Sequence, residues 1–490
     1  MTTHDNRFLI VVFDALRPEF VTPDLMPNLH AFAMRGACYT NCRSVFPTET
    51  RVNQTAVITG CTPARNGVVA NVMMARDIWP NRVLNTGIDE QLKKTMALGV
   101  NPLICVPTLS QRLKLAGRKY ASLSAGTPGG GRLINHTAEG DGTFRLAMHA
   151  PNATTPAGAF DEICAKIGPP PHFARPATAW IAWAASAYKS WIEPNVRPDV
   201  MLLWLCEPDE TFHYHGIGSP PALETMGHMD SEFGEIVAAL EPDLASGKMH
   251  VIAMSDHGQI SLRGPKIQIV SQLSDAGFRA AAAPGPDVDY VVIIHNAGGI
   301  WVRDDDPDLT RSIVGHLLEQ EWCGPIFTRG GQLGTLPLAA VDLDHPRAPT
   351  IAVTLRNFEH VNAHGSAGAT LHDAPYPDGG GCHGGLSRYE LGNFLSLSGR
   401  LFKSCSRISV PANNTDIAPT VLAGLGETSS QLDGFDGRVL REAFADDNDD
   451  AETHWHEETI AATNTTGPRT HLSFSRVGQT RYLNQAWLTH

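Results

Sequence analysis

Short apolar runs alternate along the chain with segments that have the spacing of amphipathic helices. Four runs are almost continuously apolar, and we expect them to be buried strands: residues 8–13, 120–125, 199–206 and 250–255. Helical periodicity marks residues 27–36, 107–117 and 228–240. Strands that alternate with helices in this way predict an α/β fold, with a mostly parallel central sheet and helices on both faces.

Two stretches interrupt the alternation and divide the chain. Residues 127–175 are rich in Gly, Pro, Ala and Asn, and we expect them to form a surface excursion above the sheet. Residues 266–375 have a strand and helix pattern of their own, which predicts an inserted lid or cap subdomain. Residues 1–265 and 376–444 then form the main α/β core, and residues 445–490 form a C-terminal extension with two possible strands.

Composition and charge narrow the range of partners. The net charge of the 490-residue chain is -13 and its basic residues are scattered singly, so neither a nucleic acid polymer nor an anionic membrane surface is an expected partner. A small phosphorus ester stays compatible with this charge, because metal ions can reverse the local field. Oligomeric state leaves no signal in the sequence.

Cysteine usage and the lengths of the apolar segments indicate the cellular compartment in which the protein is expected. Nine cysteines without CxxC pairs favour free thiols in a reducing environment. The apolar stretch near the N-terminus is too short for a signal peptide, and the most apolar later segment, residues 178–188, is too short to cross a bilayer. We therefore expect a cytoplasmic protein. Trp180 and Trp183, three residues apart in that later segment, are expected in the core.

Acidic and histidine side chains follow the predicted strands at their carboxyl ends. One follows the first strand, two follow the strand at 199–206, two follow the strand at 250–255, and a sixth lies in the glycine-rich segment GGGCHGG. In chain order they are Asp14, Asp209, His213, Asp256, His257 and His383. Ligands of open α/β sheets bind beyond these strand ends, so the six side chains are expected to meet. Carboxylate and imidazole groups suit Zn²⁺, with Mn²⁺ as the alternative, and six suffice for two divalent ions.

The segment FPTETR supplies a hydroxyl group for the same place. Thr48 follows Phe46 and Pro47 and precedes a helical run, so it fits a helix N-cap that needs no chemistry. A hydroxyl at a helix N-terminus is also exposed to any anion or metal bound there. Between two ions it would lose its proton easily and become a nucleophile. A cap and a nucleophile are therefore the two hypotheses for Thr48.

The order of these pieces resembles the nucleotide pyrophosphatase/phosphodiesterase family of the alkaline phosphatase superfamily. The resemblance rests on FDALRPE, FPTETRVNQTAVITGCTPARNGVVAN, PDETFHYHG, SDHG, CHGG and NTDIAPTVLAGLG, spread over residues 8–440. It implies an alkaline phosphatase-like fold and a phosphodiesterase or nucleotide pyrophosphatase that hydrolyses its ester through a phosphothreonine. The residues it implies are Asp14, Asp256 and His257 for one zinc, Asp209, His213 and His383 for the other, Thr48 as the metal-bridging nucleophile, and Asn71 as a contact to a phosphate oxygen.

Other functions on the same site stay open. A phosphonoacetate-type phosphonate hydrolase would add lysines, for which Lys266 is the candidate. A phosphomonoesterase would need a counterpart of the arginine clamp of alkaline phosphatases, for which Arg51 is the candidate. A binding protein that has lost catalysis would lack a ligand or the nucleophile, and all are present here. Substrate specificity is expected to reside in residues 72–200 and 266–375.

Overall fold

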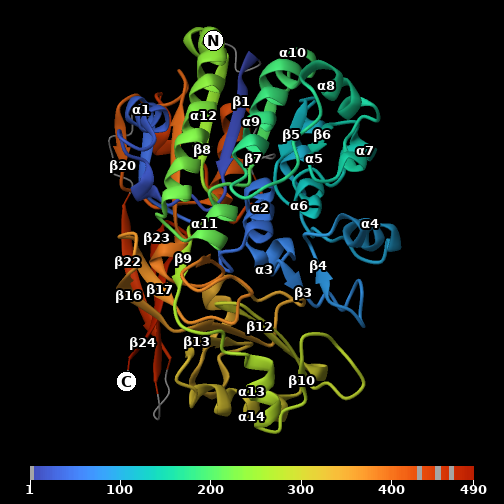
Figure 1. Ribbon diagram of the computed structural model, residues 1–490, viewed down its shortest axis with the longest axis vertical. Coiled ribbons are helices and arrows are strands. Elements are labelled where there is room, and N and C mark those ends of the chain that lie inside the picture. The colour runs from blue at the N-terminus through green and yellow to red at the C-terminus, as the bar shows by residue number, and fades with distance from the viewer. Residues whose placement is uncertain (1–4, 428–432, 447–453, 463–467, 490) are drawn as a thin grey trace.

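The computed structural model describes residues 5–427, 433–446, 454–462 and 468–489. Its centre is a sheet with the strand order β20-β2-β19-β8-β1-β7-β5-β6 (Figure 1). In that order the strands are Ser406–Ile408, Ala37–Arg43, Gly392–Ser398, Met249–Met254, Arg7–Phe13, Val200–Leu205, Tyr120–Ser124 and Phe144–Ala147. Strands β8, β1, β7, β5 and β6 are mutually parallel, whereas β19 runs antiparallel to β2 and β8. The predicted α/β architecture is confirmed, and the four apolar runs are β1, β5, β7 and β8.

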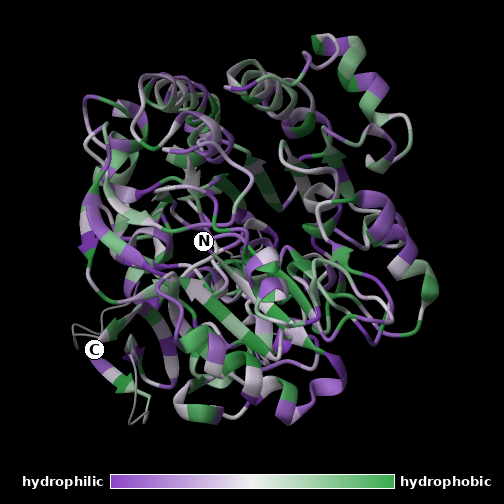
Figure 2. Ribbon diagram, turned by 60° about the horizontal axis from the view of Figure 1, so that its bottom comes forward, coloured by the Kyte–Doolittle hydropathy of each residue, from purple (hydrophilic) through white to green (hydrophobic). Residues whose placement is uncertain are grey.

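Strand β1 is buried on both faces, which explains its continuous apolar sequence. Phe8, Ile10 and Val12 join one core with residues of α2 (Thr50–Thr59), α5 (Leu109–Leu115) and α16 (Ile417–Gly424). The alternate residues of β1 join a second core with residues of α1 (Pro27–Arg35), α9 (Thr178–Ala187) and α12 (Pro220–Ser246). Helices therefore cover both faces, and in Figure 2 the central strands are largely coloured as hydrophobic. Trp180 and Trp183 belong to the second core, as expected.

Residues 127–175 do more than form a surface excursion. They contain α6 (Pro128–Leu133), α7 (Ala138–Asp141), η3 (Pro151–Ala153) and α8 (Ala159–Ile167), and they supply the edge strand β6, which pairs with β5. The apolar pattern missed β6 because the strand contains Arg145. The buried guanidinium of Arg145 donates to the carbonyl oxygens of Asn135 and Ala153, each at 2.7 Å, and pairs with Glu139, so its polar atoms are satisfied inside the fold.

A second sheet, with its own apolar core, occupies most of residues 266–375. Its order is β10-β11-β12-β15-β13-β14. These strands are Ala280–Ala281, Tyr290–Ile294, Ala297–Val302, Ile351–Leu355, Cys323–Thr328 and Leu336–Pro337, and they pack with α13 (Ile269–Asp275) and α14 (Pro307–Leu318). This subdomain lies beyond the carboxyl ends of the central strands, at the lower end of the molecule in Figure 1.

Two smaller sheets and one two-stranded pair complete the fold. The sheet β16-β17-β9-β18 comprises Asn357–Val361, Ala367–Thr370, Ile260–Leu262 and Gly381–Cys382, and the sheet β22-β23-β24 comprises Trp455–Ala461, Arg469–Val477 and Thr480–Thr489. The second of these confirms the strands expected in the C-terminal extension. The remaining α-helices and short strands are α3 (Pro63–Asn66), β3 (Val72–Met73), β4 (Leu84–Asn85), α4 (Asp89–Leu98), α10 (Glu193–Asn195), α11 (Asp209–His215), α15 (Arg388–Leu391) and β21 (Ala412–Asn413). None of the helices in the described ranges combines the length and apolar character needed to span a bilayer.

Candidate active site

Each of three histidine rings at the carboxyl edge of the central sheet is fixed by a hydrogen bond from its Nδ1 atom. In each ring Nδ1 lies within hydrogen-bond distance of a backbone carbonyl oxygen, which only accepts, so Nδ1 carries the proton. The pairs are His213 with Gly381 at 2.8 Å, His257 with Gly258 at 3.0 Å, and His383 with Thr48 at 2.8 Å. In the neutral rings Nε2 keeps its lone pair, as in most metal-ligating histidines.

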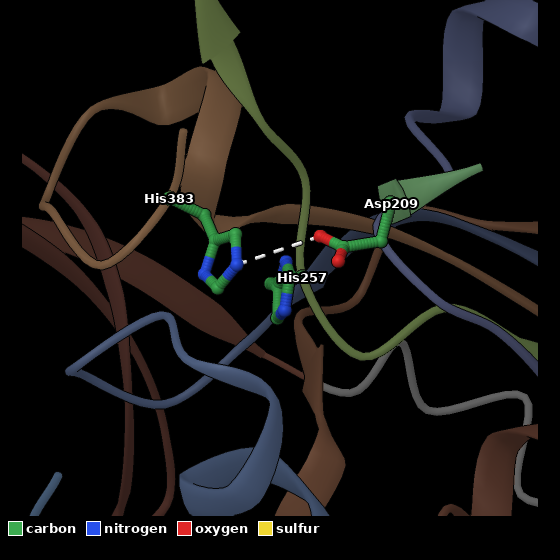
Figure 3. A group of neighbouring side chains, drawn as sticks. All are labelled: Asp209, His257 and His383. Carbon is green, nitrogen blue, oxygen red and sulfur yellow. Dashed lines mark ion pairs between the residues drawn. The ribbon is translucent and has the colours of Figure 1, made fainter. Parts of the chain in front are cut away.

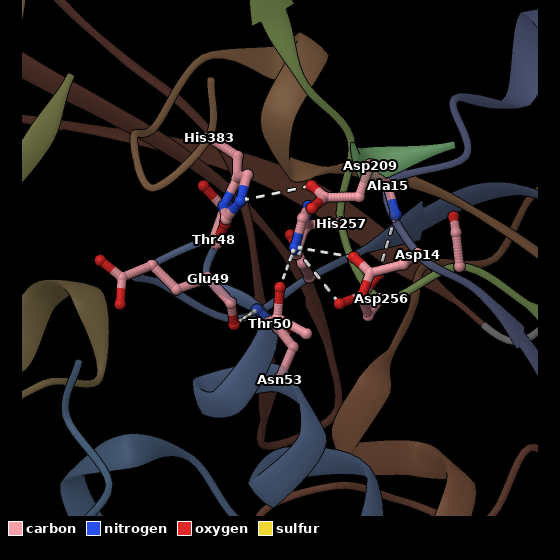
Figure 4. A network of polar contacts seen from close by, with 12 residues as sticks. Asp14, Ala15, Thr48, Glu49, Thr50, Asn53, Asp209, Asp256, His257 and His383 are labelled. Carbon is pink, nitrogen blue, oxygen red and sulfur yellow. Dashed lines mark hydrogen bonds and ion pairs between the residues drawn. The ribbon is translucent and has the colours of Figure 1, made fainter. Parts of the chain in front are cut away.

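Two carboxylates each leave one oxygen for the centre of the cluster. Asp14 follows β1 and accepts a hydrogen bond at Oδ2 from the indole N–H of Trp204 at 3.1 Å. Asp256 follows β8 and accepts at Oδ1 from the backbone N–H of Ala15 at 3.1 Å. Oδ1 of Asp14 and Oδ2 of Asp256 are buried without a hydrogen-bond partner among the described residues, at 3.6 and 3.2 Å from Nε2 of His257 (Figure 4). A buried carboxylate oxygen left without a partner is costly, so these two oxygens indicate a ligand.

The third carboxylate faces the other two histidines. Asp209 is the first residue of α11, which follows β7, and His213 lies one turn later on the same face. Nε2 of His213 is 3.3 Å from Oδ2 of Asp209, and Nε2 of His383 is 3.4 Å from Oδ1 (Figure 3). The side-chain amide of Gln259 also donates to Asp209, which fixes the orientation of this carboxylate.

The separations fit a pair of divalent ions. Two ligand atoms that each lie ~2.1 Å from a tetrahedral ion are ~3.4 Å apart. The nitrogen–oxygen separations in this cluster are 3.2–3.6 Å. Asp14, Asp256 and His257 form one group whose ligand atoms lie within 4.8 Å of one another, and Asp209, His257 and His383 form another. The structure therefore gathers all six predicted ligands, and His257 lies between the two groups.

The pKa shifts of the three carboxyl groups also indicate a cation-binding site. Burial raises the pKa of Asp14 well above its usual range, and the charges of Asp256 and Asp209 raise it further. Burial likewise raises the pKa of Asp256. Burial also disfavours ionisation of Asp209, but the adjacent imidazoles of His213 and His383 outweigh this and lower its pKa. Carboxylates crowded in this way are stabilised by a bound cation.

Thr48 does not face the cluster, and this corrects the expectation that it bridges the metals. Its buried hydroxyl donates to the carbonyl oxygen of Gly385 and accepts from the N–H of Gly384, both at 2.9 Å. It is not a helix cap either, because α2 begins at Thr50 with Glu49 at the N-cap position. Thr48 instead holds the loop that carries His383.

Thr50 occupies the place expected for Thr48. Its Oγ1 lies 3.2 Å from Nε2 of His257, at the N-terminus of α2 (Figure 4). The side-chain amide of Asn53 sets this start of the helix, since it donates to the carbonyl oxygens of Glu49 at 3.1 Å and Pro47 at 3.3 Å. The sequence signal was present in the repeated threonine of TET, but the distance along the chain did not distinguish its two hydroxyls.

A cavity of about 260 Å³ opens onto the cluster. Asn71 lines it and accepts at Oδ1 from the backbone N–H of Arg51 at 3.0 Å, which leaves its side-chain N–H groups for a ligand. Lys266 is exposed on the loop before α13 and does not line the cavity, so the structure does not support its predicted substrate contact. Trp204, Gln259 and Tyr376 escaped the sequence analysis. The walls of the cavity include Tyr376 together with Gly126, Thr127, Ile293, His295 and Trp301, which fall in the ranges expected to determine specificity.

The family model for type I phosphodiesterase/nucleotide pyrophosphatase matches residues 8–310, well over half of the chain. The chain belongs to this family. The match includes five of the six clustered ligands, from Asp14 to His257, together with Thr50 and Asn71.

Relatives of this type I phosphodiesterase/nucleotide pyrophosphatase family member are distant. Venom phosphodiesterase 2 of Crotalus adamanteus is 20% identical over 54% of this chain and 28% of its own length. Ectonucleotide pyrophosphatase/phosphodiesterase family member 3 of Mus musculus is 21% identical over 51% of this chain and 24% of its own length. The chain thus matches about a quarter of the length of these curated relatives.

A solved structure has a fold similar to that of this chain. Murine ectonucleotide pyrophosphatase/phosphodiesterase 5, as an inactive threonine-to-alanine variant in complex with AMP, superposes with a TM-score of 0.57 at 16% identity and covers 86% of this chain and 96% of that chain. At this identity the match shows the alkaline phosphatase-like fold alone.

Proposed function

We propose that the protein is a metal-dependent phosphoric ester hydrolase of phosphodiesterase or nucleotide pyrophosphatase type. The observation that carries the proposal is the hydroxyl of Thr50 at 3.2 Å from His257, inside a set of six oxygen and nitrogen ligands whose spacing fits two ions. Phosphodiesterase names among the relatives, and the AMP bound to the murine family member 5, support a small phosphorus ester as substrate.

The residues of the chain have separate roles in the proposed reaction. Asp14, Asp256 and His257 would hold one divalent ion, and Asp209 with His213 and His383 would hold the other. Zinc suits these ligands best, with manganese as the alternative. When bound, the two ions would favour the ionised threonine hydroxyl and neutralise negative charge on the phosphoryl and leaving oxygens.

Thr50 attacks the phosphorus atom in line with the leaving group. The bond from Oγ1 to phosphorus forms as the bond to the leaving oxygen breaks, which gives a phosphothreonine and an alcohol or phosphate product. Water then hydrolyses the phosphothreonine and restores the hydroxyl. The side-chain N–H of Asn71 and the free N–H groups of the first turn of α2 hold the phosphoryl oxygens throughout.

Quantifying turnover and metal on the same samples tests the proposal. We expect cleavage of bis(p-nitrophenyl) phosphate by the zinc-loaded protein, about two metal ions per chain, and loss of turnover in Thr50→Ala. Turnover that persists in Thr50→Ala, or in protein stripped of metal, would contradict it. Nothing now favours the phosphonate hydrolase, because Lys266 lies outside the cavity.

A further inference from the structure

Arg51 is the one lysine or arginine among the described residues that line the cavity. It directly follows Thr50 in the first turn of α2. Its backbone N–H donates to Asn71, so the residue is anchored to the same group that would hold the phosphoryl oxygens. A side chain at this place can reach whatever is bound next to the reacting phosphorus.

The guanidinium of Arg51 makes no hydrogen bond or ion pair with a described residue; burial lowers its pKa, and the charges of Glu49 and Asp14 oppose this. Its Nε is buried with no hydrogen bond, and no carboxylate of the described residues forms an ion pair with it. By contrast, the buried guanidinium of Arg347 pairs with Asp77 at 2.7 Å and donates to the carbonyl oxygens of Pro102 and Leu103. Since arginine stays charged in proteins, an unpaired guanidinium on a cavity wall points to an anionic ligand.

The guanidinium of Arg51 lies close to Gly87. A Cβ atom built on Gly87 would lie 3.7 Å from Nη2 of Arg51, and 3.6 Å from the hydroxyl of Thr127. The guanidinium therefore lies toward the Gly87 and Thr127 side of the cavity. A group bound to Arg51 would occupy the side of the phosphorus that faces this wall.

Arg51 can bind a negative charge beyond the one that the other groups of the site would hold. In a simple phosphodiester one negative charge is shared by two oxygens, and Asn71, the α2 N-terminus and the two ions would hold both. A guanidinium fork binds a further anionic group with two parallel hydrogen bonds. The cavity of about 260 Å³ admits a compact group of this kind beside the reacting phosphate.

We propose that Arg51 is a specificity-determining residue that binds a second negative charge next to the reacting phosphorus. This proposal rests on the proposed hydrolase function and deepens it: the preferred substrates are phosphate esters or anhydrides with that extra charge. The charge has two chemical sources. It is either the second ionised oxygen of a phosphate monoester or the neighbouring phosphate of a pyrophosphate bond.

Three substrates separate these sources. They are bis(p-nitrophenyl) phosphate with one charge, p-nitrophenyl phosphate with two charges on one phosphorus, and ATP with charges on neighbouring phosphates. In Arg51→Gln we expect kcat/KM to fall about 30-fold or more for the substrate that supplies the extra charge, and less than about 3-fold for the diester. Arg51→Lys should recover part of the loss, because lysine keeps the charge without the fork. Arg175→Gln is the matched control, since Arg175 does not line the cavity and its guanidinium is already paired with Glu210 at 2.7 Å.

A binding measurement keeps this inference separate from the proposed function. Calorimetric titration of the zinc-loaded protein with phenylphosphonate, which has two charges, and with its monomethyl ester, which has one, needs no turnover. We expect Arg51→Gln to weaken only the doubly charged compound, by about 10-fold or more. Equal weakening of both compounds, or equal loss of kcat/KM for all substrates, would overturn the role of Arg51. Absence of turnover in the wild type with a normal binding difference would instead overturn the hydrolase function.

Discussion

Substitution of the two threonines of TET shows which hydroxyl reacts. Thr50→Ala removes the hydroxyl at 3.2 Å from His257 and leaves all six metal ligands in place. We expect kcat/KM for bis(p-nitrophenyl) phosphate to fall at least ~10³-fold, which corresponds to about 4 kcal/mol of transition-state stabilisation. Thr50→Ser keeps a hydroxyl and should retain measurable turnover.

Thr48→Val perturbs structure without removing the nucleophile. Valine has nearly the shape of threonine, but the N–H of Gly384 and the carbonyl oxygen of Gly385 lose their partner at 2.9 Å. A buried polar group without a partner costs about 1–3 kcal/mol, so we expect the free energy of unfolding to fall by about 2–4 kcal/mol. The loop of His383 would then hold metal less well, with affinity reduced about 10- to 100-fold. At saturating zinc, turnover should stay within about 10-fold of the wild type.

The assay combines three measurements on the same samples. Release of p-nitrophenolate gives turnover at limiting and saturating zinc, elemental analysis gives metal content, and mass spectrometry of acid-quenched protein locates the phosphate on the peptide that contains both threonines. We expect the phosphate on Thr50. A phosphate on Thr48, or a Thr48→Val variant as inactive as Thr50→Ala at saturating zinc, would refute the assignment.

Three further perturbations test the site and its surroundings. A chelator should lower the melting temperature, and zinc should restore it, because bound metal at 100 times its Kd adds about 2.7 kcal/mol to stability; an unchanged melting temperature would argue against a resident metal. Trp204→Phe removes the hydrogen bond to Asp14 and should weaken zinc affinity about 10-fold in a competition titration, while stability in excess zinc changes little. Burial raises the pKa of Glu390 to about 7 from 4.5, so the folded protein keeps a proton that the unfolded chain releases between these values. The stability that this carboxyl contributes is fully present below about pH 4.5 and is lost as the pH rises through about 7. The unfolding free energy of the wild type minus that of Glu390→Gln should therefore decrease over this range by up to about 3 kcal/mol. A difference that stays constant with pH would contradict a buried, protonated Glu390.

Local sequence patterns were sufficient to predict the centre of the fold. Strands β1, β7 and β8 are buried on both faces, so their apolar runs are continuous, and adjacent parallel strands bring Asp14, Asp209 and Asp256 to one edge. Strand β6 could not be found in this way, because the partners that satisfy Arg145 become visible only in three dimensions. The position of Lys266 likewise depends on the path of an exposed loop, which periodicity does not determine.

The different contacts of Thr48 and Thr50 show why the site itself was harder to predict than the fold. Thr48 contacts Gly384 and Gly385, more than 330 residues away in the chain, and these contacts decide which hydroxyl turns away from the six clustered ligands. The segment from Thr48 to Thr50 therefore contacts both ligand groups. The carbonyl oxygen of Thr48 accepts a hydrogen bond from His383, and the hydroxyl of Thr50 lies within hydrogen-bond distance of His257. Thr50, the proposed nucleophile, and a histidine of each ligand group are thus positioned by a shared set of hydrogen bonds. A change that shifts the start of α2 must also move His383, so reactivity and metal affinity in this protein should vary together when that segment is altered.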